Sequence, residues 1–233
     1  MIDRIARTVK SWEVALRTSW GDDISTPALR RQALWHFHVF DHAWLRKVWT
    51  NFAEVAPGVF RSNQPDHARL CRMREFGMRT IINLRGTPQQ SHYLFEEESC
   101  ADLGLEMINL RLHARRAAPR SELLLLIETF RTAEKPLLVH CKSGADRAGL
   151  ASAIYLLAIE GQPVAEARKQ LGLRYVHLKW SKTGICDHLL DVYDARTAEG
   201  AIGFEEWIAT EYDPVELEAD FARSRGRQVA LQP

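Results

Sequence analysis

A cysteine and an arginine stand at the two ends of a short loop in the segment LLVHCKSGADRAGLASAIYLL, residues 137–157. The apolar run that ends at Cys141 is typical of a buried strand, and a helical pattern begins near Arg147. A loop between a strand and a helix N-terminus turns backbone N–H groups inward and gains positive charge from the helix dipole, so it binds an oxyanion. In that field we expect the Cys141 sulfur to be an ionised nucleophile, beside a guanidinium that grips two phosphate oxygens. The spacing therefore predicts attack of sulfur on phosphorus.

The neighbours of Cys141 make this pattern specific. Requiring a histidine before the cysteine and a glycine three positions after it lowers the accidental rate to roughly one in a thousand. None of the other three cysteines has an arginine six positions later. Gly144 and Gly149 also permit the tight backbone and the close approach that an anion-binding loop requires.

The elements that must position the loop follow from the pattern of the chain. Short apolar runs alternate with helical patterns, and the strands are predicted at 59–62, 80–84, 105–112 and 137–141. This alternation predicts an α/β domain with a central, largely parallel sheet flanked by helices. We place the domain at residues 52–195, after a helical N-terminal extension at 1–51 and before a C-terminal helical tail at 196–233.

The segment HCKSGADRAG resembles the HC-x5-R signature loop of the cysteine-dependent protein tyrosine and dual-specificity phosphatases. The resemblance covers residues 52–195, and VFRSNQP (59–65) and TIINLRG (80–86) are similar to two core strands of that family. It implies the phosphatase fold, with Cys141 as the nucleophile of a phosphocysteine intermediate, Arg147 as the phosphoryl ligand and His140 as a residue that hydrogen-bonds nearby backbone and tunes the sulfur. The substrate-binding positions implied by the resemblance are His140, Lys142, Ser143, Gly144, Ala145, Ala148 and Gly149.

The general acid departs from the family pattern. The family places an aspartate on an upstream loop, but the matching loop HARRAAPR (113–120) has no carboxylate. Asp146 is the substitute that we expect, because an acid also precedes the signature arginine in bacterial lipid-like phosphatases of the HCxxGKDR type and in myotubularin-like and Sac-type phosphoinositide phosphatases. That pattern has lysine where this chain has Ala145. Two alternatives stay open: Asp146 caps the helix or pairs with an arginine, or His113 is the acid.

Ala148 is the second departure, since the family has serine or threonine after the signature arginine. That hydroxyl hydrogen-bonds the departing sulfur when water resolves the intermediate. Its absence is expected to slow the dephosphorylation of Cys141 more than its phosphorylation.

Basic residues near the loop suggest the substrate class. Lysine and arginine side chains here would suit a polyanion such as a phosphoinositide or another phospholipid head group. The alternative is that they are ordinary solvated surface charges, which say nothing about the substrate. The candidate rim residues are Lys142, Lys182, Arg115, Arg116 and Arg120, and in RYVHLKWSKTG (174–184) also His177 and Lys179. The substrate is therefore expected to be a phosphotyrosine protein or a phosphorylated lipid or inositol.

Composition excludes several classes of protein. With 31 Lys+Arg against 30 Asp+Glu, the chain has no general polyanion-binding coat, so no nucleic-acid partner is expected. The four cysteines form no CxxC pair, which argues against a zinc ribbon or a disulfide framework. In HFHVFDH (36–42) only His38 and His42 share a helix face, too few ligands for zinc. We expect no metal and no cofactor.

The opening segment, residues 1–20, carries a charge every few residues and lacks the apolar stretch of a signal peptide. No run approaches a membrane span, so a cytoplasmic location is expected. Apolar residues from Ile2 to Leu16 recur at helical spacing among basic ones. Such a helix would either pack on the domain or make peripheral contact with an anionic membrane.

Two other function classes stay open from the sequence. One is a pseudophosphatase that binds phosphorylated partners without turnover, which the altered acid and Ala148 suggest. The other is a rhodanese-like or arsenate-reductase-like sulfur enzyme, which also places a cysteine in an anion-binding loop.

Overall fold

A computed structural model describes residues 21–41 and 43–230 of the chain, with only the backbone for 227–230. Its centre is a five-stranded sheet in the order β1-β2-β5-β3-β4. β1 is antiparallel to β2 and the other neighbours are parallel, which confirms the largely parallel sheet. The strands are β1 (Ala53–Ala56), β2 (Val59–Asn63), β3 (Thr80–Asn83), β4 (Glu106–Asn109) and β5 (Leu137–Cys141).

β5 lies at the centre of the sheet because all five of its residues, LLVHC, are buried. Its register sets Cys141 beside Asn63 of β2, and His140 beside Asn83 of β3. The carboxyl ends of three parallel strands therefore meet where the chain leaves Cys141. This edge is where ligands bind in open α/β sheets.

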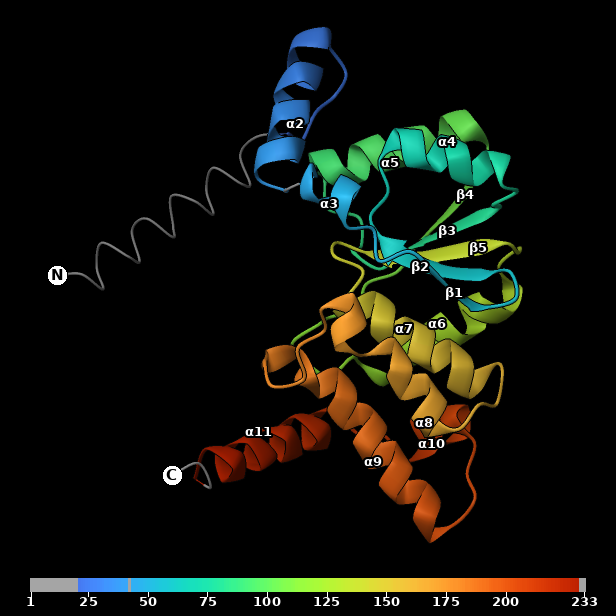
Figure 1. Cartoon of the computed structure of the whole chain (residues 1–233), viewed down its shortest axis with the longest axis vertical. Helices are drawn as coiled ribbons and strands as arrows, with labels where there is room; N and C mark the ends of the chain where they lie inside the picture. Colours follow the sequence, from blue (N-terminus) through green and yellow to red (C-terminus); the bar gives the residue numbers. More distant parts are fainter. Residues whose placement is uncertain (1–20, 42, 231–233) are drawn as a thin grey trace, which may run out of the picture.

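Helices cover both faces of the sheet. Figure 1 shows α4 (His67–Glu75) and α5 (Ser91–Leu103) over one face, and α6 (Arg120–Thr132) and α7 (Asp146–Ala158) over the other. The remaining helices are α2 (Pro27–Val39), α3 (Leu45–Val48), α8 (Val164–Ala167), α9 (Ile185–Glu199), α10 (Phe204–Thr210) and α11 (Pro214–Ala230). Short 3-10 turns occur at η1 (Arg168–Gln170), η2 (Leu173–Tyr175) and η3 (Lys182–Gly184).

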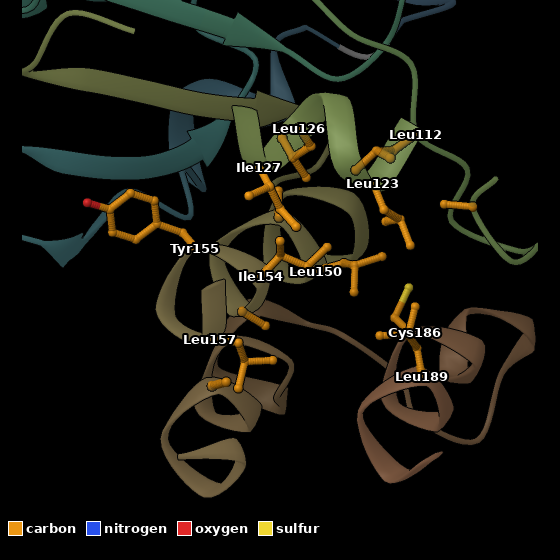
Figure 2. Close-up of a cluster of buried hydrophobic side chains, with 14 of the residues drawn as sticks. Leu112, Leu123, Leu126, Ile127, Leu150, Ile154, Tyr155, Leu157, Cys186 and Leu189 are labelled. Carbon is orange, nitrogen blue, oxygen red and sulfur yellow. The ribbon is translucent and has the colours of Figure 1, made fainter. Parts of the chain in front are cut away.

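The helix that follows the signature loop is buried nearly all round. Every residue from Ala148 to Leu157 is buried, as expected for a helix that is apolar on all sides. Figure 2 shows Leu150 and Ile154 of α7 lying between side chains of α6 and Cys186 and Leu189 of α9. The start of α7 is therefore held by a packed core, which fixes the end of the loop in place.

Two segments differ from the sequence-based boundaries. The boundary predicted at residue 195 falls inside α9, and Trp207 and Tyr212 beyond it belong to the main core. The Tyr212 hydroxyl donates to the Ala118 carbonyl at 2.7 Å. The C-terminal helical tail thus packs on the domain through these aromatic residues, while its charged residues lie between them in the sequence. β1 was not predicted, since AEVA is short and only partly buried.

The described part of the N-terminal extension packs against α5. Arg30 forms two hydrogen bonds to Glu98, at 2.8 and 2.6 Å, and His36 Nδ1 lies 2.9 Å from Ser91 Oγ. The helix expected within residues 1–20 lies outside the described residues. Within 21–41 and 43–230, no helix has the length and apolarity that a membrane crossing needs.

Candidate active site

The signature loop, residues 141–147, leaves β5 at Cys141 and enters α7 at Asp146. Cys141 is 1 % exposed, so a phosphoryl group must enter the loop to reach the sulfur. Gly144 has a φ of +74°, and a Cβ there would lie 2.6 Å from the Asn63 backbone nitrogen. Only glycine tolerates both the conformation and the close approach. The loop is thereby pressed against the end of β2.

Four carbonyl groups of the loop, those of residues 142–145, accept hydrogen bonds from residues outside it. The Lys142 carbonyl accepts from the Gln64 N–H at 3.5 Å, and the Ser143 carbonyl accepts from Asn51 Nδ2 at 2.8 Å. The Gly144 and Ala145 carbonyls accept from one buried guanidinium, at 2.6 and 3.3 Å. In a trans peptide the next N–H points opposite to the carbonyl. The N–H groups of residues 143, 144 and 146 are therefore directed into the loop, where they give an oxyanion-binding concavity. The Ala145 N–H donates to Ser143 Oγ at 3.3 Å.

That guanidinium belongs to Arg61 of β2, which is fully buried. Its Nη1 donates to the backbone carbonyl and the side-chain oxygen of Gln170 at 2.6 and 2.9 Å, and the group stacks on the Tyr175 ring at 3.7 Å. Burial lowers the pKa of Arg61 to about 10, which still leaves it charged at neutral pH. Arg61 joins the signature loop to the segment that follows α8.

We expect Arg61→Met to lower the free energy of unfolding by about 3 kcal/mol, because the Gly144 and Gln170 carbonyls lose charged donors while staying buried. The activity should fall with it, since the loop carbonyls are released. Urea denaturation followed by tryptophan fluorescence measures the stability. Arg223→Met, at an exposed ion pair with Asp220, is the control that should change little. Equal stability of the two variants would contradict this role.

Arg147 is half-buried at the first turn of α7. Its Nη1 donates to the Leu84 carbonyl at 3.3 Å, just beyond the end of β3. This bond directs the guanidinium across the carboxyl end of the sheet. The remaining N–H groups of its planar fork can bind phosphoryl oxygens in the same direction.

Asp146 is joined to a buried histidine and a second carboxylate. His177 Nδ1 lies 2.7 Å from Asp146 Oδ1, and its Nε2 lies 2.6 Å from Asp187 Oδ2. Burial acts to lower the pKa of His177, but the hydrogen bonds to Asp146 and Asp187 outweigh it and raise the pKa to about 9. At neutral pH the imidazole therefore carries both protons. The sequence left open that Asp146 pairs with an arginine. In the structure its partner is a histidine, His177.

His113 is poorly suited to act as an acid. Arg116 Nη2 lies 3.0 Å from His113 Nε2, and burial together with this guanidinium lowers the pKa of His113. A neutral imidazole that accepts from an arginine has no proton to give at that nitrogen. The loop 113–120 thus supplies no proton donor from this side chain.

Lys142 is tied to the N-terminal extension through Asp41. Its Nζ lies 3.2 Å from Asp41 Oδ1, while Arg85 Nη2 and Arg46 Nη1 approach the same carboxylate at 2.8 and 2.5 Å. Burial acts to raise the pKa of Asp41, but these cations lower it well below its ordinary range. Asp41 is therefore an ion-pair centre beside the loop. Among the described residues no metal-binding cluster occurs, and His42 lies outside them.

The side chains of the other predicted loop positions are held by packing and by contacts with neighbouring elements. His140 is fully buried, and its Nε2 lies 2.9 Å from Glu96 Oε1. Neither ring nitrogen of His140 makes a hydrogen bond with any described residue, so the bond to backbone expected from the resemblance is not present. Ala148 is fully buried and its carbonyl accepts from Ser152. A Cβ on Gly149 would lie 2.7 Å from the Gln170 carbonyl, so this glycine permits the approach of η1. Ser143 is exposed and Ala145 is buried.

The expected basic rim is only partly near the loop. Arg120 donates to the Tyr212 carbonyl at 2.6 Å and joins α6 to the C-terminal helices, so it is structural. Lys179 Nζ lies 3.8 Å from Asp191, and Lys182 is exposed. Of the three residues singled out in 174–184, His177 is the one whose contact with the signature loop is direct.

Several site residues were not found from the sequence, namely Arg61, Asn51, Asp41, Glu96 and Asp187. Arg61 had a signal, because an arginine inside the apolar strand VFRSN must be paired when it is buried. The others lie far along the chain from residue 141, and their local sequence resembles ordinary surface or capping positions.

Comparison with known proteins assigns the family. Residues 50–183, more than half of the chain, match the family described as PTP-SAK, Swiss Army Knife protein, DSP-PTPase phosphatase domain. The chain belongs to this family. This membership confirms the resemblance of the signature loop to that of the cysteine-dependent phosphatases. The matched DSP-PTPase region includes β1 to β5, the loop, Arg61 and His177.

Individual relatives of this DSP-PTPase chain are distant. The dual specificity protein phosphatase TpbA of Pseudomonas aeruginosa (strain UCBPP-PA14) is 25% identical over 126 residues, which cover 51% of this chain and 53% of that protein. The chain thus spans about half the length of the curated relatives it matches. The crystal structure of P. aeruginosa TpbA has a TM-score of 0.51 at 19% identity, over 64% of this chain and 91% of that one. A DUF442 phosphatase structure from Shewanella putrefaciens CN-32 gives 0.53 at 15% identity, over 65% and 94%. These structures support the DSP-PTPase fold.

Proposed function

We propose that this chain is a phosphomonoester hydrolase that works through a phosphocysteine intermediate on Cys141. The observation that carries the proposal is the set of four loop carbonyls held outward by Gln64, Asn51 and Arg61. They leave the loop N–H groups facing inward above a cysteine, with Arg147 beside them. Such preorganised donors stabilise the charge of a transferring phosphoryl group.

In the first step the sulfur forms a bond to phosphorus while the ester P–O bond breaks. The leaving oxygen takes a proton from Asp146, and Asp146 takes one from His177 Nδ1 across 2.7 Å. His177 becomes neutral and still donates through Nε2 to Asp187. In the second step water attacks phosphorus, its proton passes through Asp146 to His177, and inorganic phosphate leaves with the thiolate restored.

In this pathway His177 holds the proton, and Asp146 transfers it to the leaving oxygen. The imidazole is charged at neutral pH, and Asp146 relays its proton as the leaving oxygen gains charge. General acid catalysis of this kind contributes about 10²- to 10⁴-fold. It matters most for alkyl leaving groups, whose alkoxides are strongly basic.

We expect His177→Gln to slow hydrolysis of an alkyl phosphate by about 10²-fold, and that of an aryl phosphate with an acidic phenol far less. For the wild type, the alkyl rate should be retained below the His177 pKa of about 9 and fall as pH rises through that value, because the imidazolium is then lost. The pH–rate profile of the variant should lack this fall. Asp146→Asn should likewise slow hydrolysis of the alkyl phosphate far more than that of the aryl phosphate. If Asp146→Asn hydrolysed the alkyl phosphate at the wild-type rate, the pathway would be excluded.

A pocket beside the loop supports a substrate with an apolar group next to the phosphate. It measures about 310 Å³, and Leu45, Trp49 and Val176 form its apolar walls. Lys142, Ser143, Ala145 and Asp146 line the side toward the signature loop. A TpbA variant has been crystallised with phosphotyrosine. We propose a phosphotyrosine protein or a phosphorylated lipid or inositol as substrate, and peripheral membrane contact through the N-terminal segment and a cytoplasmic location stay predictions.

The pseudophosphatase alternative has one observation in its favour, the buried Ala148 that offers no hydroxyl to the sulfur. If the wild type hydrolyses an aryl phosphate steadily and Cys141→Ser abolishes this activity, the pseudophosphatase alternative is excluded. Membership in the DSP-PTPase family favours phosphoryl transfer over the sulfur-enzyme alternative. Sulfur transfer from thiosulfate without phosphatase activity would reverse that preference.

A further inference from the structure

Two exposed apolar segments flank the pocket beside the signature loop. The first runs from Trp44 to Trp49 through α3, and the second from Leu173 to Trp180 through η2. Asn51 joins them, because its Nδ2 donates both to the Ser143 carbonyl and to the Tyr175 carbonyl. We call their exposed apolar residues the mouth face, which consists of Trp44, Leu45, Val48, Trp49, Leu173, Val176 and Trp180.

These side chains are exposed to an unusual degree for their size. Val48 is 87 % exposed, Trp180 67 % and Trp44 56 %. Single exposed apolar residues are common, but a group of them around a pocket beside the signature loop indicates an interaction surface. Tryptophan is the residue that prefers the boundary between water and lipid.

Backbone strain holds one of these residues, Val176, at the pocket beside the loop. Val176 has a φ of +59°, a left-handed conformation that a β-branched residue rarely adopts. Its N–H donates to the Leu173 carbonyl at 2.9 Å, and the flanking Tyr175 and His177 are fixed by Arg61 and Asp146. The valine is nevertheless 42 % exposed and lines the pocket. Strain of this kind is retained where a surrounding structure imposes it, which is common at ligand sites.

The two segments that form the mouth face carry charge of one sign, although Lys47 and Lys179 lie 3.7 and 3.8 Å from Asp66 and Asp191 of neighbouring elements. Neither residues 43–53 nor residues 167–186 contain an aspartate or a glutamate, and together they carry seven lysines and arginines. Lys47, Lys179, Arg174 and Lys182 are exposed. The two carboxylates that line the pocket, Asp41 and Asp146, are each paired with cationic groups. A surface of tryptophans among basic residues matches an anionic bilayer in both polarity and charge.

We propose that the mouth face docks on an anionic membrane surface and so presents the signature loop to a phosphorylated lipid head group. This inference rests on the proposed phosphatase function and narrows its substrate class to phospholipids. The apolar side chains of the mouth face enter the head-group region, and the basic side chains contact lipid phosphates. The substrate then reaches Cys141 without leaving the bilayer.

The test is co-sedimentation of the full chain with vesicles of phosphatidylglycerol and phosphatidylcholine, compared with vesicles of phosphatidylcholine alone. We expect binding to the anionic vesicles that Val48→Glu weakens by about 10-fold or more, since it replaces an inserted apolar group with a repelled charge. Val215→Glu is the matched control, because this valine of α11 is 74 % exposed and lies outside the mouth face. Lys179→Glu should weaken binding by about 5-fold or more, since each basic residue near an anionic surface contributes about 1 kcal/mol.

Hydrolysis of a soluble aryl phosphate separates this inference from the proposed function. It should be equal in wild type, Val48→Glu and Val215→Glu, while hydrolysis of a phospholipid phosphomonoester in vesicles should fall only in Val48→Glu. Loss of vesicle binding to the same degree in both valine variants, or equal binding to neutral and anionic vesicles, overturns the docking. Wild-type binding that Val48→Glu leaves intact also overturns it and would assign membrane contact to another segment. Absence of aryl phosphatase activity in the wild type would instead contradict the proposed function.

Discussion

Cys141→Ser is expected to reduce kcat on an aryl phosphate by on the order of 10⁴- to 10⁶-fold, as removal of a nucleophile does in other enzymes with covalent intermediates. The serine hydroxyl is too weak an acid to be ionised by the loop N–H groups and the start of α7, so it does not attack phosphorus. The substitution is nearly isosteric, and the outward bonds of the loop carbonyls to Asn51 and Arg61 do not involve the sulfur. Steady-state kinetics with a soluble aryl phosphate measures the effect.

Cys71→Ser is the matched control for this loss. Cys71 lies on α4, is free, and contacts His67 at 3.5 Å, away from the signature loop. Its replacement should leave kcat unchanged. If Cys141→Ser retained activity within about 10-fold of wild type, the nucleophile would have to be another group and the covalent pathway would be wrong.

Arg147→Lys is expected to lower kcat by on the order of 10³-fold, the scale on which a single arginine acts on a transferring phosphoryl group. Lysine keeps the positive charge but loses the planar fork that binds two oxygens while a third N–H donates to the Leu84 carbonyl. Both kcat and kcat/KM should fall, because the fork acts mainly on the transition state. The measurement is the same aryl phosphatase assay with a full substrate titration.

Arg131→Lys is the control for the change of residue type. Arg131 forms an ion pair with Glu205 on the outside of α6, where a lysine can replace it at little cost. If Arg147→Lys raised KM and left kcat unchanged, the guanidinium would only bind substrate. That outcome would remove Arg147 from the stabilisation of the transition state.

The sheet and the loop were predictable because their signals are local. The buried strand LLVHC, the glycine at 144 and the helix from Asp146 are contiguous in the sequence, and each has a strong pattern of its own. β4 was predicted as 105–112 and spans only Glu106–Asn109. The apolar residues after it, Leu110 and Leu112, are buried on irregular backbone on either side of an isolated bridge between Arg85 and Arg111. Burial alone therefore overstated the length of the strand.

The support of the loop was not predictable, because it comes from residues that are distant along the chain. Arg61 and Gly144 are 83 positions apart, and Asp146 and His177 are 31 apart. Nothing in the local sequence indicates which buried polar group will find which partner, since that depends on how β2, α7 and η2 pack. Asp41 illustrates this limit: it lies within HFHVFDH, a segment weighed from the sequence as a metal site, and in the fold it pairs with Arg46, Arg85 and Lys142.

The measurement that tests the central claim most directly is acid quenching of the enzyme during turnover of a labelled aryl phosphate, followed by mass spectrometry of its peptides. We expect phosphate on the peptide that contains Cys141 in the wild type, none in Cys141→Ser, and less at steady state in Ala148→Ser, because a hydroxyl at 148 speeds hydrolysis of the intermediate. Steady turnover with a linear time course and no phosphate on Cys141 would contradict a covalent pathway through this residue.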